Sequence, residues 1–211
     1  MKKTLQIQTA LFFKENFSRS FEEISLKIKN VIAGEPVTMQ LPVPPNAPPE
    51  VPRLILNYEG KIAINVAKNR IDFFYSNFSN EKDTIIKIFN EITNLGLIIG
   101  RVGFVKNIFL DDNNIEDIKK YLVEDKSNKL LNLKEISIRV NTFKKIGEFE
   151  CNNIQNIANG KINSNGVIED GVLVVRDINT SVESITVNEV TNEKLSIILD
   201  DFNNETELFI I

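Results

Sequence analysis

Apolar side chains recur along this chain with two spacings, one typical of strands and the other of helices. The first 13 residues alternate between apolar and polar positions, which predicts a strand. Ser20 and Glu23 then have the spacing of a capping box, and Phe21 and Ile24 begin a series of apolar residues on one helical face. The chain is therefore expected to open with a strand followed by a helix.

Two apolar stretches after residue 52 predict a hairpin. Residues 53–58 and 61–66 are separated by Glu59 and Gly60, a short connection in which glycine can adopt a positive φ. A third strand is expected over residues 70–75. Helical spacing then returns in a segment that Ser79 or Asn80 is expected to cap and Gly96 to end.

The same order of elements starts again at residue 97. A long apolar stretch predicts a strand, a group of acidic and amide residues caps a short helix, and further strands and a helix follow. The expected elements are a strand over 97–110, a helix over 115–122, strands near 136–140, 149–157, 172–175 and 182–187, a helix over 195–202 and a strand over 207–211.

These elements predict an α+β fold in which an antiparallel sheet carries the helices on one face. Each half of the chain has the order strand, helix, strands, helix. We therefore hypothesise two similar halves, residues 1–96 and 97–211, that share one sheet, either as two units or as one continuous domain. A superposition that failed to align the two sheets would contradict this hypothesis.

All seven prolines lie within residues 36–52. Proline fixes φ and lacks an N–H, so this segment is expected to run extended in polyproline II form, neither as helix nor as central strand. Its simplest role is a crossover that lies on its own domain. The alternatives are an arm that grips another subunit and a ligand for a partner's aromatic groove, for which the candidate residues are Pro44, Pro45, Pro48, Pro49, Pro52 and Arg53.

The composition excludes several classes of function but adds little to the predicted fold. Among its 211 residues the chain has no His and a single Cys, Cys151. Without His, the Ser-His-Asp and Cys-His catalytic sets and His-ligated metal sites are excluded. A lone Cys forms no internal disulfide, so a reducing, cytoplasmic location is expected, and no stretch is apolar enough to predict a membrane span.

The formal net charge of −4 disfavours a sequence-independent nucleic-acid binder. Gly100 and Gly103 resemble the Gly-x-x-Gly loop by which KH domains hold a nucleic-acid backbone, although their apolar flanks favour glycines that relieve crowding in a long strand. A nucleic-acid partner thus remains as an alternative that would need a local basic face. Its candidate residues are Lys61, Lys68, Arg70, Arg101 and Lys106.

Carboxylates are the main candidates left for catalysis or metal binding. The acidic cluster that starts at Asp111 has the oxygen ligands that Ca²⁺ prefers, but acids in the first turn of a helix explain the same residues. A third function class is a phosphodiesterase-type enzyme with carboxylate-bound metals, for which Asp72, Asp170 and Asp177 are further, scattered candidates. No catalytic set, metal site or cofactor motif is identified, which favours a protein without catalytic activity.

Three segments are similar to a sporadically distributed family of uncharacterised bacterial proteins. They are residues 44–56, with Pro-Pro followed by Pro-Arg and a hairpin strand, residues 68–70, and residues 174–180, with Asp-Ile-Asn at a strand end. The resemblance implies a bacterial origin and a scattered, accessory-gene distribution, and it transfers no catalytic residue.

The function that these observations favour is non-catalytic binding, either to a protein partner or to a second copy of the chain. The sheet edge and the proline segment are the expected contact surfaces.

Overall fold

The computed structural model describes residues 2–18, 20–111, 137–164, 166–183 and 189–204. Nine strands form one sheet in the order β2-β3-β4-β5-β1-β6-β9-β8-β7, and every neighbouring pair is antiparallel. The strands are β1 (Lys2–Phe13), β2 (Val37–Gln40), β3 (Leu54–Tyr58), β4 (Ile62–Val66), β5 (Arg70–Tyr75), β6 (Ile99–Asp111), β7 (Ser137–Ile146), β8 (Phe149–Ser164) and β9 (Val167–Thr180). The chain therefore has the mixed architecture with an antiparallel sheet that the sequence predicts.

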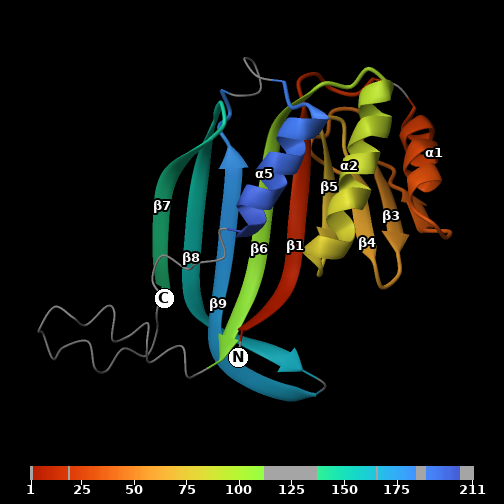
Figure 1. Cartoon of the computed structure of the whole chain (residues 1–211). Helices are drawn as coiled ribbons and strands as arrows, with labels where there is room; N and C mark the ends of the chain where they lie inside the picture. The colour runs from red at the N-terminus through yellow and green to blue at the C-terminus, as the bar shows by residue number, and fades with distance from the viewer. Residues whose placement is uncertain (1, 19, 112–136, 165, 184–188, 205–211) are drawn as a thin grey trace, which may run out of the picture.

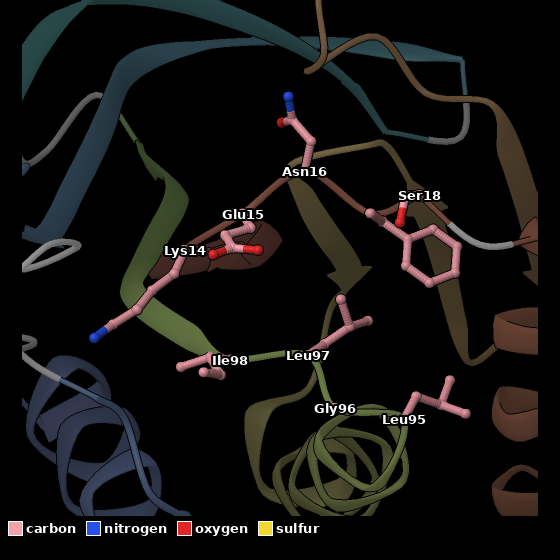
Figure 2. A pocket seen from close by; sticks show the side chains of 9 residues that line it. Lys14, Glu15, Asn16, Ser18, Leu95, Gly96, Leu97 and Ile98 are labelled. Atoms are coloured by element: carbon pink, nitrogen blue, oxygen red, sulfur yellow. The ribbon is translucent and has the colours of Figure 1, made fainter.

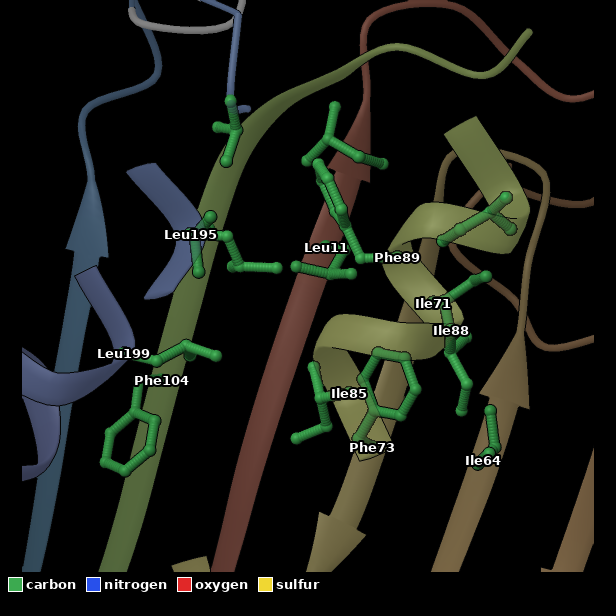
Figure 3. Packing of buried hydrophobic residues seen from close by; sticks show 14 of the residues in the cluster. Leu11, Ile64, Ile71, Phe73, Ile85, Ile88, Phe89, Phe104, Leu195 and Leu199 are labelled. Atoms are coloured by element: carbon green, nitrogen blue, oxygen red, sulfur yellow. The ribbon is translucent and has the colours of Figure 1, made fainter. Parts of the chain in front are cut away.

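The described helices are α1 (Phe21–Val31), α2 (Phe78–Asn94) and α5 (Asn192–Asn204), and all three lie on one face of the sheet (Figure 1). Between them and the sheet lies the main core, where Ile85, Ile88 and Phe89 of α2 pack toward Leu11 and Phe73 (Figure 3). These side chains are at most 2% exposed. Their helical spacing in α2 and alternating spacing in the strands explain why both elements form against this core.

The centre of the sheet joins the two parts of the chain. β1 pairs with β5 on one side, where Thr9 faces Phe73, and with β6 on the other, where Thr9 faces Phe104. The strands β2 to β5 form one antiparallel meander and β7 to β9 another, and each meander ends next to β1 or β6. One continuous sheet is therefore built from described strands of both parts of the chain.

The helices α1 and α2 differ in how they are capped, because the Asn77 side chain makes no capping hydrogen bond. The Ser20 hydroxyl accepts a hydrogen bond from the Glu22 N–H, which confirms the expected cap of α1. The prediction of Ser79 or Asn80 as the cap of α2 is wrong, because the cap position is Asn77. The earlier start places Phe78 inside the helix, where its ring packs against Phe104 with the centroids 6.0 Å apart.

The proline segment departs from the extended conformation that its composition predicts. The Ala47 N–H donates to the Pro44 carbonyl and the Val51 N–H to the Pro48 carbonyl, so each Pro-Pro pair opens a turn. Proline is favoured at the second position of a turn, which Pro45 and Pro49 occupy. The same segment contains β2, an edge strand that the sequence did not reveal.

The strands β7, β8 and β9 are longer than the sequence predicts. β8 continues to Ser164 and β9 begins at Val167, and together they form a hairpin that extends past the end of β6 (Figure 1). Gly171 permits a close approach there, because a Cβ at this position would clash with the Leu110 carbonyl and the Phe109 ring.

Several other expectations are settled by the strands. Gly100 and Gly103 lie inside β6, so the KH-type loop is wrong and the strand interpretation holds.

The segments 115–122, 184–187 and 207–211 lie outside the described residues. Among the described helices, none combines the length and apolar character needed to cross a membrane.

Candidate binding surface

One face of the sheet carries no described helix. Leu11 points toward the helices, so its neighbours Ala10 and Phe12 point to the opposite face, because side chains alternate along a strand (Figure 3). We call this opposite side the open face. The strand register places Phe12 between Arg70 of β5 and Arg101 of β6 in one row across the open face.

The two arginines of this row contact the same aromatic ring. The guanidinium carbon of Arg70 lies 5.7 Å from the Phe12 ring centroid and that of Arg101 lies 4.7 Å from it. Such cation–π contacts stabilise a partly exposed pair by about 0.5–1 kcal/mol each. The row thus connects β5, β1 and β6 through side chains as well as through the backbone.

Each guanidinium also contacts residues on its own side of β1. Arg70 forms an ion pair with Asp72, with Nε 2.9 Å from Oδ2. Arg101 donates from Nε to the Thr180 carbonyl at 2.9 Å and from Nη2 to the Asn179 Oδ1 at 2.8 Å. These contacts favour a role in joining strands over a role in binding phosphate.

Asp72 is the most buried charged group of the open face, with 2% of its side chain exposed. Burial raises its pKa above the usual value, while the Arg70 charge and the hydrogen bond from Gln8 Nε2, at 3.0 Å, lower it by less. The carboxylate is therefore less stable in the folded protein than in water, despite its partners.

The five residues of the predicted basic face are not brought together. Arg70 and Arg101 share the row described above, and Lys68 lies in the turn before β5, where its N–H donates to the Pro49 carbonyl. Lys61 lies at the other end of β4 and donates to the Ala33 carbonyl at 3.3 Å. Lys106 points to the helix side, where its Nζ lies 3.5 Å from Asn203 Oδ1, and burial lowers its pKa.

The residues predicted for partner binding in the proline segment differ in access. Pro44, Pro45 and Pro48 are exposed, while Pro49 and Pro52 are partly buried. Arg53 is only 8% exposed, and its Nη1 donates to the Val51 carbonyl at 2.9 Å. The prolines can therefore meet a partner at the turns, but the arginine stabilises the segment itself.

The scattered carboxylates also stay apart. Asp72 lies on β5 and Asp177 on β9, separated in the sheet by β1 and β6. Asp170 pairs with Lys161 in the β8–β9 hairpin at 2.8 Å. In the part of the chain that the structure describes, no three potential metal ligands of the His, Cys, Asp and Glu types lie together.

A pocket of about 260 Å³ lies between the loop after β1 and the loop after α2 (Figure 2). Leu95, Leu97 and Ile98 line one side, and Glu15 and Asn16 are among the polar residues on the other. Both polar side chains are exposed loop residues. The pocket brings together no pair of groups suited to a specific reaction.

The edge of the sheet at β2 is protected by proline. The Leu41 N–H donates to the Arg53 carbonyl, which continues the β2–β3 register. Because pairing alternates along an antiparallel strand, the backbone groups of Thr38 and Gln40 point away from the sheet. Pro36 and Pro42 occupy the next outward positions and offer no N–H.

The edge at β7 has no such protection among the described residues. β7 pairs with β8 from Ile146 and Phe149 onward, around the two-residue turn at Gly147. The residues next to such a turn exchange hydrogen bonds with each other, so the pairing residues of β7 have even numbers. The outward backbone groups belong to Ser137, Arg139, Asn141, Phe143 and Lys145.

The side chains of these outward residues are exposed as well. Burial alternates strictly along β7, with the odd-numbered residues exposed and Phe143 at 81%. By register Phe143 faces Asn152, which faces Asn179 of the open face, so the exposed side chains of β7 continue that face. Sequence reasoning missed this edge, because alternation predicts a strand but not its place in the sheet.

Comparison of the chain with models of known protein families and with curated proteins gives no match. The resemblance to the sporadic bacterial family therefore stays a prediction.

Proposed function

We propose that this protein is a non-catalytic binding protein that takes an extended segment of a partner protein onto the outer edge of β7. The observation that carries this proposal is the contrast between the two edges of the sheet. Proline flanks the outward backbone groups of β2, whereas β7 offers the outward groups of five residues with no proline among them. An added strand would bind through main-chain hydrogen bonds, as in other cases of strand addition.

Phe143 is a natural anchor for such a partner. It has the largest exposed fraction among the large apolar side chains of the described residues, at 81%. Aromatic residues contribute strongly to binding when a partner covers them. It stands beside Asn141, the middle residue of the outward series, and so lies near the centre of the contact.

A partner of different sequence suits this edge better than a second copy of the chain. β7 contains Arg139, Lys144 and Lys145 but no acidic residue. Pairing of two β7 strands would place all these cations along one seam, and basic side chains are a known means of preventing edge-to-edge pairing. We therefore propose a partner segment from another protein.

The test removes one outward donor of β7 without disturbing the sheet. Asn141→Pro deletes an outward N–H but leaves the β7–β8 hydrogen bonds intact, since those belong to the even-numbered residues. Peptides should be selected for binding to the wild-type chain from a library of random extended sequences. We expect the selected peptides to lose at least tenfold in affinity for the Asn141→Pro variant.

Gln40→Pro is the matched control, because it makes the same change at an outward position of the opposite edge. Selected peptides should bind this variant as well as they bind the wild-type chain. Peptides that bind Asn141→Pro with unchanged affinity, or a library that yields no binder, would contradict the proposal.

For the architecture and location we propose two similar halves, residues 1–96 and 97–211, in a cytoplasmic protein. The strand order supports the halves, because in each part the first strand lies next to the last strand of a meander. Superposition of the two sheets is the direct comparison.

A further inference from the structure

The outer edge of β7 carries a charge pattern as well as backbone groups that pair with no other described strand. Arg139 and Lys145 stand at two outward positions, six residues apart, with Asn141 and Phe143 between them. Both cations are exposed. No ion pair or hydrogen bond joins either side chain to another described residue, whereas Lys144 on the helix side pairs with Asp201 at 2.7 Å.

The nearest acid on the neighbouring strand forms no ion pair with this edge. Glu150 faces Lys145 in the β7–β8 register, but the two side chains form no ion pair within 4.0 Å. Arg139 faces Asn156, which is uncharged. The edge therefore presents two cations on the same face of the sheet, six residues apart, and neither has an ion-pair partner among the described residues.

The other face of β7 is apolar in the first half of the strand. Ile138 and Val140 are partly buried and pack against a small cluster formed by residues of β6, β8 and β9. An added strand would place two of its alternate side chains beside Ile138 and Val140. Apolar residues at those positions would extend the cluster, since directly opposite side chains of neighbouring strands contact each other.

We infer that the partner segment is an acidic, amphipathic extended peptide, with carboxylates that reach Arg139 and Lys145 and apolar side chains beside Ile138 and Val140. This inference rests on the proposed function of the β7 edge and adds the chemistry of the partner. Opposite charges stabilise directly opposed residues in a sheet, and like charges destabilise them. The same cations that prevent pairing between two copies therefore select an acidic strand.

A symmetric probe tests the inference without knowledge of strand direction. The fluorescein-labelled peptide Glu-Val-Thr-Val-Thr-Val-Glu has the spacing of the outward series and places a Glu opposite each cation in the parallel and the antiparallel orientation. Two comparison peptides carry Gln or Lys in place of both Glu. Fluorescence anisotropy with the full chain at low salt gives the three affinities.

We expect the acidic peptide to bind about tenfold more tightly than the basic one, with the Gln peptide between them. The preference should shrink at about 0.5 M salt, because the charges involved are exposed. Lys145→Glu should weaken binding of the acidic peptide about threefold or more, and Arg139→Glu with Lys145→Glu should reverse the order of the three peptides. Lys87→Glu, an exposed change of equal charge on α2, is the control and should leave the affinities unchanged.

The outcomes separate the inference from the proposed function. Equal binding of the three peptides, with loss of binding in Asn141→Pro, would overturn the acidic chemistry and leave the β7 edge as the binding site. Preference for the basic peptide would also overturn it. Absence of binding by all three peptides, together with selected peptides that ignore Asn141→Pro, would overturn both. Circular dichroism melting of each variant verifies that the sheet is intact.

Discussion

At the scale of single residues, the polar groups of the open face work as connectors. Asp72 accepts a hydrogen bond from Gln8 and pairs with Arg70, so it bridges β5 and β1. The charged form of Asp72 is nevertheless unfavourable in this bridge, because burial raises the pKa of Asp72 more than its partners lower it. Asp72 therefore fixes the arrangement of β5 and β1, while its buried charge lowers the free energy of unfolding at neutral pH.

This cost predicts a pH dependence of stability. A carboxyl whose pKa is raised in the folded state contributes stability below its unfolded pKa, and that contribution is lost as the pH rises through the folded pKa. The free energy of unfolding of the wild-type chain minus that of Asp72→Asn should therefore decrease as the pH rises from about 4 to about 7. Urea denaturation at several pH values measures it. A difference that grows with pH would mean that Arg70 outweighs burial.

The residues of the candidate surfaces could be predicted only in part. Arg70 and Arg101 are candidates for a basic face from the sequence, but their contact with Phe12 depends on the register of three strands. Residues 70 and 101 belong to β5 and β6, which lie on either side of β1 in the sheet although β1 is far from both in the sequence. Register between distant strands is set by the whole packed sheet, so no local pattern reveals it.

At the scale of elements, the two edges of the sheet are protected by different means. β2 has four residues, no charge, and prolines at the outward positions on either side. β7 has ten residues, and its basic side chains repel a second strand of like charge. Proline removes hydrogen-bond donors and blocks every partner, whereas charge blocks only partners of like charge.

Removal of the proline protection should therefore expose β2. Pro42→Thr restores an outward N–H next to Gln40 and lengthens an uncharged edge that already exposes Val37 and Met39. We expect the weight-average sedimentation coefficient to increase with protein concentration more steeply than for the wild-type chain. Pro48→Thr, in the exposed turn, is the control and should not change it. Identical sedimentation of both variants would show that proline is not what protects this edge.

Element types were more predictable than element lengths. The alternation over 53–58 and 61–66 predicted the β3–β4 hairpin almost residue for residue. β8 extends beyond residue 157 through Ala158, Asn159 and Gly160, which have little preference for strands. Pairing with β9 holds this part in the sheet, and a partner strand is invisible in a local pattern.

At the scale of the whole molecule, one aromatic residue connects the two parts of the chain on the helix side. The Phe104 ring lies 6.0 Å from that of Phe78 and 6.2 Å from that of Phe202, between centroids. Phe78 belongs to α2 and Phe202 to α5. An ion pair between Lys82 and Asp200, at 2.6 Å, joins the same two helices. These contacts favour folding as a single cooperative unit.

Phe104→Ala tests this cooperativity. Phe104 is fully buried, so its truncation should lower the free energy of unfolding by about 3–5 kcal/mol. Hydrogen exchange should show equal loss of protection in β4 and in β8, one strand from each part. Phe143→Ala removes an equally large but exposed ring and should change stability by no more than about 0.5 kcal/mol. Loss of protection in β8 alone would indicate two independently stable domains.

The central position of β1 also bears on how the chain folds. Residue 9 pairs with residues 73 and 104, so the middle strand of the sheet has no partner nearby in sequence. The hairpins β3–β4, β7–β8 and β8–β9 close over short loops and can form early, whereas β1 must wait for both of its neighbours. Until then Leu11 and Phe13, both buried in the finished sheet, are exposed to solvent. During synthesis we therefore expect β1 to stay exposed to chaperones and to aggregation for longer than the three hairpins.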